Sequence, residues 1–346
     1  MVGHVHHAAD FDMSGVIIVE IPEKEGGQRL DRWLRNRYPG LGQGKLQKLL
    51  RTGQIRVDGA RAKAGDRVDA GQSIRIPPNI ESPRDQTAAQ KRSRNQMDAE
   101  DVERIGNDLK DRVLYMDDNV LAIDKPYGLA VQGGTGTKNH VDGVLDRLKL
   151  GAGERPRLVH RLDRDTTGVL LLARNRQAAV HLGDIFKARD TRKIYWALVD
   201  GHPRHDEGLI DAPLSKLPGK HGERMRVDFD DGKHAETRFR VIDHAGKAIS
   251  WLELEPFTGR THQLRVHCEV LETPIVGDPK YGRGATSDLA PAGIEARLHL
   301  HAHRLIVPYS DKKVIDVIAP LPAHMQDSWS RLGFDAKDDQ AQLVDL

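Results

Sequence analysis

The sequence is poor in cysteine and contains no long apolar run. Cys268 is the single cysteine in 346 residues, so no disulfide can form within the chain, which is typical of proteins from reducing compartments. No apolar stretch approaches the length of a membrane-spanning helix. The first 14 residues lack the cationic start and apolar core of a signal peptide. We therefore expect a cytoplasmic protein with no membrane partner.

Motifs for metal and nucleotide chemistry are also missing. The 17 histidines include no HExxH pair, and one cysteine cannot build a Cys/His ligand set. The glycine-rich stretch KPYGLAVQGGTGTK (125–138) lacks the Gly-Lys-Ser/Thr ending of a P-loop. Its glycines are better explained by a loop that closely approaches another group. We expect neither a bound metal nor nucleotide hydrolysis.

Positive charge, in contrast, is concentrated in one N-terminal block. Residues 15–78 carry 13 Lys and Arg against 7 Asp and Glu, whereas the whole chain has a net charge of only +2. Apolar spacing predicts helices over 28–38 and 45–52, and Asp58-Gly59 predicts a hairpin turn. A compact basic unit of this kind is the electrostatic pattern expected for binding a polyanion.

Composition divides the chain into five segments. We expect a disordered tail, the basic unit, a polar linker, a large domain and a C-terminal tail, at 1–14, 15–78, 79–110, 111–326 and 327–346. The second half of the linker could be helical. In the large domain, strand-like alternation recurs in KIYWALVDG, AETRFRVIDH and AISWLELEPF, the last two as an antiparallel pair. Helices scattered between such strands predict an α+β fold with mixed, mainly antiparallel sheets.

The segment VHRLDRDTTGVLLLARN (159–175) places charged residues against a purely apolar run. Val169 to Leu172 predict a short strand buried on both faces. Asp165 precedes a turn-like Thr-Thr-Gly, so a glycosidase-type pair with Asp163 is unsupported. Asp163 is the better candidate for a single working carboxylate. Spacing alone, however, favours a carboxylate that accepts backbone N–H bonds within the turn.

A second cluster lies in LEPFTGRTHQLRVHCEVLETP (254–274). Thr258 or Thr261 could cap a helix with Leu264, Cys268 and Leu271 pointing inward. Basic side chains then crowd its first turns, where the helix dipole favours anions. They imply a nearby protein carboxylate or phosphate, unless they are simply solvated. These residues are Arg260, His262, Arg265 and His267.

Four motifs in order carry a resemblance to a known family. HRLDRDTTGVLLLAR, KIYWALVDG, GRTHQLRVH and RLHLHAHRL resemble the RluA-type pseudouridine synthases, and the resemblance covers nearly all of residues 113–322. The basic block resembles an S4 (αL) RNA-binding domain. AVQGGTG and GKHAETRF look closest to bacterial members that modify large-subunit ribosomal RNA. Gln132 departs from the histidine that relatives commonly place in the glycine-rich loop.

The resemblance implies roles for individual residues. Asp163 would be the catalytic aspartate, Tyr195 would lie against the target base, and Arg265 would form an ion pair with Asp163. Arg161 would occupy the space left by a flipped base. Leu300 and His301 would line the cleft. The remaining RNA-binding candidates are Arg164, Arg260, His262, Gln263, Arg32, Lys45, Lys48 and Arg51.

The resemblance also implies the activity, a uridine-to-pseudouridine isomerisation that needs no cofactor. Asp163 could act as a nucleophile or as a general base. Two alternatives remain open: a synthase that acts on transfer RNA, and a non-catalytic RNA-binding ribosome-assembly factor. Metal-assisted RNA hydrolysis lacks a carboxylate cluster. We expect large-subunit ribosomal RNA as the partner, and a monomeric enzyme.

Overall fold

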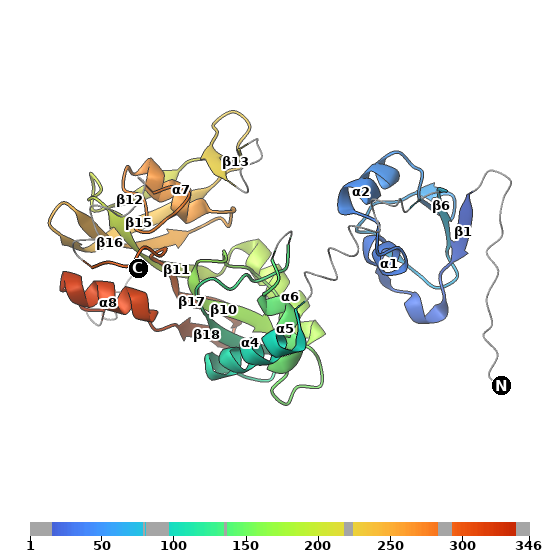
Figure 1. The fold of residues 1–346 in the computed structure, drawn as a ribbon, viewed down its shortest axis with the longest axis horizontal. Helices are drawn as coiled ribbons and strands as arrows, with labels where there is room; N and C mark the ends of the chain where they lie inside the picture. Colours follow the sequence, from blue (N-terminus) through green and yellow to red (C-terminus); the bar gives the residue numbers. More distant parts are fainter. Residues whose placement is uncertain are drawn as a thin grey trace. The chain divides into compact units, whose positions relative to one another are not determined.

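The computed structural model describes residues 16–78, 80, 97–134, 137–217, 224–282 and 293–336. The chain forms two compact units, which we call the N-terminal unit (1–96) and the C-terminal unit (97–346) (Figure 1). The tail expected at 1–14 lies outside the described residues. Within the described part of the chain, no helix is long and apolar enough to cross a membrane.

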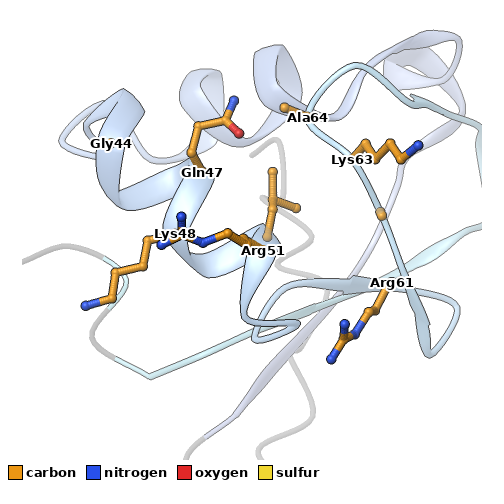
Figure 2. Close-up of a pocket in the computed structure, with 9 residues that line it drawn as sticks. Gly44, Gln47, Lys48, Arg51, Arg61, Lys63 and Ala64 are labelled. Atoms are coloured by element: carbon orange, nitrogen blue, oxygen red, sulfur yellow. The ribbon is translucent and has the colours of Figure 1, made fainter. Parts of the chain in front are cut away.

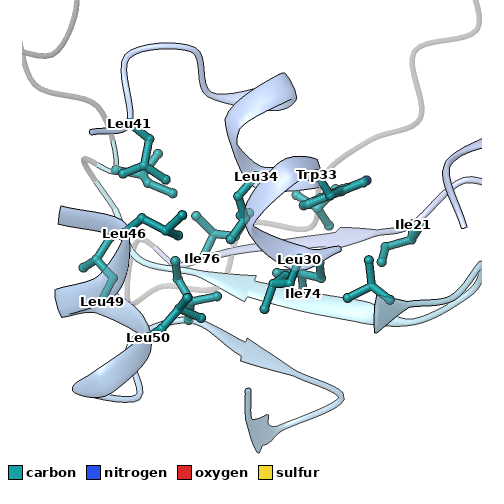
Figure 3. Packing of buried hydrophobic residues seen from close by; sticks show 14 residues of the cluster. Ile21, Leu30, Trp33, Leu34, Leu41, Leu46, Leu49, Leu50, Ile74 and Ile76 are labelled. Carbon is teal, nitrogen blue, oxygen red and sulfur yellow. The ribbon is translucent and has the colours of Figure 1, made fainter. Parts of the chain in front are cut away.

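The N-terminal unit packs two helices on a small sheet. Helices α1 (Leu30–Arg37) and α2 (Gln43–Arg51) confirm the two expected helices, with starts shifted by two residues. Their apolar faces meet Ile74 and Ile76 on strand β6 (Ser73–Ile76) (Figure 3). The remaining elements are β1 (Ile17–Glu20), the 3-10 turn η1 (Glu23–Glu25), β2 (Gln28–Arg29), β3 (Arg56–Val57), β4 (Ala60–Arg61) and β5 (Arg67–Val68).

The sheet of this unit has the order β1-β6-β3-β4, and β2 pairs separately with β5. Asp58 and Gly59 join β3 to β4, both with positive φ (48° and 77°). Asn, Asp and Gly tolerate this left-handed region best, which confirms the predicted hairpin turn. The two helices thus pack their apolar side chains against the sheet and leave most of their basic side chains exposed to solvent.

The C-terminal unit is built on one large sheet. Its strands follow the order β12-β15-β16-β11-β17-β10-β8-β7, with β18 beside β17 and β9 beside β10, and the pair β10–β17 alone is parallel within the described sheet. The mainly antiparallel α+β prediction is therefore confirmed. The strands are β7 (Val113–Met116), β8 (Val120–Lys125), β9 (Arg157–Leu158), β10 (Thr167–Ala173), β11 (Arg192–Asp200), β12 (Glu207–Asp211), β15 (Glu236–Ala245), β16 (Ile249–Pro256), β17 (Leu300–Ser310) and β18 (Lys313–Ile318).

Helices cover both faces of this sheet. Alternate residues of β10 pack against opposite layers, so all seven are buried, as the apolar run predicted. The hairpin of β13 (Leu214–Lys216) and β14 (Met225–Val227) stands apart from the sheet. The helices are α4 (Ala99–Asp111), α5 (Val141–Val144), the 3-10 helix η2 (Leu145–Leu148), α6 (Arg176–Ala188), α7 (Gln263–Val270) and α8 (Ala323–Leu332).

Two predicted boundaries are wrong. The expected linker 79–110 contains most of α4, which buries Ile105 and Leu109 against α5 and η2. The expected tail 327–346 begins inside α8, whose Trp329 packs with Trp251 in the core. Both helices are short and highly charged on their wet faces, so composition alone favoured solvent-exposed segments.

Candidate active site

The catalytic candidates meet in one pocket of the C-terminal unit. Its walls come from three places: the loop 161–163 with Thr166, the strand residues Tyr195 and Leu300, and the segment 256–265. The sheet brings these parts together, because β11 lies between β16 and β17, and β17 pairs with β10. The pocket therefore brings together residues from all four sequence motifs.

Asp163 sits on a loop held from behind by β8 and β10. Lys125, at the end of β8, is fully buried and donates to the carbonyl oxygens of Pro126, Leu129 and Arg164, at 2.8–2.9 Å. His160 Nε2 accepts a hydrogen bond from the Leu171 amide at 2.8 Å. These bonds fix both sides of the loop to the buried sheet, so Asp163 has a rigid support.

A glycine is required where this loop enters β10. Gly168 has φ of 104° and lies against the backbone of Ala302 on β17, so that any Cβ would collide with the Ala302 carbonyl. Thr167 is paired with His301 in the same parallel register. The close approach of β10 to β17 therefore depends on glycine in the Thr-Thr-Gly sequence.

The Asp163 carboxylate is not used by the turn that contains it. The Thr166 amide donates to the backbone oxygen of Asp163, and no hydrogen bond between described residues ends on its carboxylate. The alternative of a turn-stabilising carboxylate is thus excluded. Burial raises the pKa of Asp163, and the charges of Arg265, Arg161, Lys125 and Lys280 oppose that rise. The site holds one desolvated carboxylate among cations.

Arg265 affects Asp163 as a neighbouring charge and not through the expected ion pair. On α7, its guanidinium forms a bidentate pair with Asp278, at 2.7 Å and 2.6 Å. Both side chains are buried, with 4% and 0% exposed. The anionic partner implied by the basic cluster is therefore a protein carboxylate. The predicted direct Arg265–Asp163 ion pair is wrong, because the guanidinium is paired with Asp278. No role was predicted for the segment 275–282, which contains Asp278.

Tyr195 lies in the pocket at an irregularity of β11. The register between β11 and β17 shifts between Ile194 and Tyr195, and such bulges re-aim a side chain. Burial, with the Asp163 charge as a smaller cause, raises the pKa of the Tyr195 phenol. Tyr195 therefore stays protonated at neutral pH and presents an uncharged aromatic face beside the carboxylate.

Hydrogen bonds of the Gln263 side chain hold the segment 258–263 in place. Gln263 Oε1 accepts from the Thr258 hydroxyl and the Arg260 amide, while Nε2 donates to Glu236 O and Thr237 Oγ1. Gln263 lines the pocket with both of its amide hydrogens already donated within the protein, and its predicted RNA contact stays a prediction. The helix cap also differs from the prediction, because α7 begins after His262, without a side-chain cap from Thr258 or Thr261.

The other predicted residues divide between the pocket and elsewhere. Arg161, Arg260 and Leu300 line the pocket, and Arg260 Nε also donates to His234 O. His301 does not line it: it is fully buried and bonded to Thr167 and to the carbonyl of residue 319. The cleft prediction for His301 was wrong, because alternation along β17 turns it to the face opposite Leu300.

Arg164 lies outside the pocket walls. Its Nε forms a solvent-exposed ion pair with the neighbouring Asp165 at 3.0 Å, and 65% of the Arg164 side chain is exposed. Its predicted RNA contact therefore stays a prediction. The structure separates the two arginines of the HRLDR sequence, with Arg161 at the carboxylate and Arg164 on the surface.

The N-terminal unit carries a second concave site, which we call the basic hollow. It is lined by Lys48 and Arg51 on α2 and by Arg61 and Lys63 on a neighbouring segment (Figure 2). Leu50 is also among its lining residues. Lys48 and Arg51 were predicted, whereas Arg61 and Lys63 were missed because they lie at the end of β4 and in the loop after it, where no helical spacing marks them. The structure places Arg32 on the exposed side of α1 and Lys45 half-buried on α2.

Three further residues at the active site were missed. Lys125 in DKP, Asp278 in GDPKYG and Tyr281 in the same stretch are all buried near the pocket. A lysine at the end of a buried strand and an aspartate before a proline were the available signals. Among the described residues, no cluster of three or more His, Cys, Asp or Glu could hold a metal ion.

Comparison with known proteins gives a consistent result. Residues 119–270 match the family described as RNA pseudouridylate synthase. "Ribosomal large subunit pseudouridine synthase C" of Vibrio cholerae is 36% identical over 92% of this chain and 97% of its own. "RNA pseudouridine synthase 4, mitochondrial" of Arabidopsis thaliana is 35% identical over 87% of this chain and 78% of its own.

A solved structure agrees with these relatives. "Human RNA Pseudouridylate Synthase Domain Containing 4" superposes with a TM-score of 0.58 and 30% identity. The match covers 68% of this chain and 97% of the human one. The shared fold and the shared sequence therefore indicate the same family.

Proposed function

This chain belongs to the RNA pseudouridylate synthase family, and from that premise we propose that it isomerises uridines of large-subunit ribosomal RNA to pseudouridine. One observation carries the proposal: the Asp163 carboxylate lies in a pocket beside Tyr195, surrounded by cations, and its oxygens accept no hydrogen bond from the described residues. The ribosomal target is supported by the name of the Vibrio cholerae relative.

The reaction breaks the bond between ribose and N1 of uracil and forms a bond from ribose to C5. The proton on C5 leaves and N1 gains one, so the product is an isomer and no oxidant, reductant or cofactor is consumed. Asp163 acts either as a nucleophile or as a general base. Its desolvated setting suits both routes, because water is kept from a base that is detached midway.

Substrate entry requires the uridine to leave its stack, at a cost of a few kcal/mol. Stacking on an aromatic ring returns about 1–3 kcal/mol per base, and Tyr195 supplies a neutral ring at the pocket wall. We assign Arg161, which is exposed and lines the pocket, to the position that the flipped base vacates in the RNA. The basic hollow of the N-terminal unit binds the phosphate backbone of the RNA.

The test is to map pseudouridine on unmodified large-subunit ribosomal RNA after incubation with the purified protein. Carbodiimide labelling and primer extension read the modified positions, with Asp163→Asn as the control. New stops that disappear in the variant would establish both activity and target. Stops on transfer RNA alone would support the transfer RNA alternative. Tight RNA binding with no product on either RNA would favour the non-catalytic assembly factor.

Two further features belong to the same proposal. We infer a monomeric enzyme, because the described pocket is complete within one chain. We place it in the cytoplasm, where bacterial ribosomal RNA is made; the Arabidopsis thaliana relative is named as mitochondrial. Sedimentation of the free protein and fractionation of the producing cell test these two points.

A further inference from the structure

His262 has a strained and closely supported position in the pocket wall. It has φ of 54° in the left-handed region, directly before α7, and its side chain is buried. Its Nδ1 lies 2.8 Å from the Tyr281 hydroxyl, with the two rings in edge contact. A non-glycine residue in this backbone region is uncommon and costs free energy, so the surroundings hold it there.

The partners of Tyr281 fix the proton position on His262. The Met225 amide donates to the Tyr281 oxygen at 2.8 Å, and an amide nitrogen can only donate. The phenolic proton is then available for His262 Nδ1. The opposite tautomer would leave that proton without an acceptor at a buried residue, which costs about 1–3 kcal/mol.

His262 is also uncharged. Burial, together with the smaller effects of the Arg265, Lys280 and Arg161 charges, lowers its pKa to about 3, against the opposing charge of Asp278. A neutral ring that accepts at Nδ1 carries its proton on Nε2. No described residue is hydrogen-bonded to Nε2, and Nε2 is not among the enclosed, unpartnered polar atoms. This N–H therefore opens into the pocket that His262 lines.

We propose that His262 donates a hydrogen bond from Nε2 to a carbonyl oxygen of the target uracil, with Tyr281 as its positioning residue. The inference rests on the proposed function. Uracil presents two carbonyl acceptors, whereas cytosine presents an amino donor at position 4. A phosphate would be better met by the arginines of the same wall, Arg161 and Arg260. A fixed neutral donor recognises the base without adding charge near Asp163.

The test combines protein variants with altered RNA. Single-turnover rates are measured for the wild type, His262→Ala and His262→Gln on the mapped target, made with uridine, 2-thiouridine or 4-thiouridine. We expect His262→Ala to lose about 10- to 100-fold on uridine, the range for an unpaired buried acceptor. Sulfur is a poor acceptor, so that loss shrinks on one thio RNA, which identifies the carbonyl. His262→Gln, which keeps a donor, recovers part of the rate.

The controls separate this inference from the proposed function. His205→Ala, at an exposed histidine outside the pocket, should leave all rates unchanged. An equal loss for His262→Ala on all three RNAs would show a purely structural role and overturn the inference. If the wild type modifies no RNA, the proposed function fails first, and the base assignment fails with it. If the wild type is active and His262→Ala is equally active, the inference about His262 is contradicted while the proposed function stands.

Tyr281 has a readout that does not depend on turnover. Nitrogen-15 NMR of labelled histidine distinguishes the two neutral tautomers, and subtraction of the His262→Gln spectrum identifies the His262 signals. We expect a neutral ring protonated on Nε2 in the wild type and a mixed tautomer in Tyr281→Phe. As a single substitution, Tyr281→Phe should also slow turnover. In the double variant with His262→Ala, it should cause no loss beyond that of His262→Ala alone. Protonation on Nδ1 in the wild type would refute the assignment.

Discussion

The two units of this protein use charge in opposite ways. In the N-terminal unit, Lys48, Arg51, Arg61 and Lys63 surround an open hollow, with no described acidic side chain in ion-pair contact. In the C-terminal unit, the important charges are buried beside one another, as in the Arg265–Asp278 pair. Exposed charges are screened by salt, and buried charges much less. Binding by the first unit should therefore respond to salt, and chemistry in the second to pH.

The largest expected effect comes from removing the charge of Asp163. Asp163→Asn should lower the rate by about 10²–10⁴-fold or more, because a positioned acid–base or nucleophilic group is lost. RNA affinity should stay within about twofold, since phosphate contacts supply most of it. Parallel rate and filter-binding measurements check this. Thermal unfolding serves as the control for folding. The unfolding temperature of the variant should be no lower than that of the wild type, because the substitution removes a carboxylate that burial disfavours.

A buried pair and an exposed pair should differ strongly in stability. Asp278→Asn leaves the Arg265 guanidinium buried without its anion, and breaking such a pair costs about 3–5 kcal/mol. Asp327→Asn breaks the exposed pair with Arg331 and should cost at most about 1 kcal/mol. Denaturant unfolding of both variants measures the difference. Equal costs would contradict the contrast between the two kinds of charge.

The basic hollow should control salt dependence without affecting chemistry. Replacing its four cations with glutamine should weaken RNA binding and reduce the slope of log affinity against log salt. Each lost phosphate contact changes that slope by about 0.7–0.9, so the loss of four contacts changes it by at most about 3.6. Single-turnover rates at saturating enzyme should be unchanged.

A matched control removes four exposed cations of the C-terminal unit. Its salt slope should change less than that of the hollow variant. An equal change would show that the excess charge of residues 15–78 is not a localised binding site. The control substitutions are Lys187→Gln, Arg189→Gln, Arg204→Gln and Lys247→Gln, all at exposed positions.

The sequence predicted best what depends on neighbouring residues. The period of apolar residues located α1 and α2, and the unbroken apolar run located β10, because burial on one or two faces leaves a direct trace in the sequence. The Asp58-Gly59 turn was found for a local reason too, namely its positive φ values. Residue types near a strand end also identified Asp163 as a candidate.

Contacts between residues that are far apart in the sequence could not be predicted in this way. Arg265 was assigned to Asp163, but Asp278 lies closer in the fold, and nothing in the spacing between 265 and 278 sets which carboxylate it meets. His301 was misplaced because alternation along β17 turns its side chain away from the pocket and into a hydrogen bond with Thr167. Charged helices such as α8 were taken for tails, since their core contacts are with distant strands.

The smallest expected effect is a shift in the pH dependence of kcat, and it reports specifically on the buried Asp163 carboxylate. Turnover requires the deprotonated Asp163, whose pKa is raised by burial and held down in part by the charge of Arg161. Arg161→Gln removes that opposing charge, so the pKa rises further and the acid limb of the kcat profile moves to higher pH. Arg164→Gln is the control, because Arg164 lies outside the pocket and pairs with Asp165. A limb that moves equally in both variants, or toward lower pH in Arg161→Gln, would show that the limb does not report on Asp163.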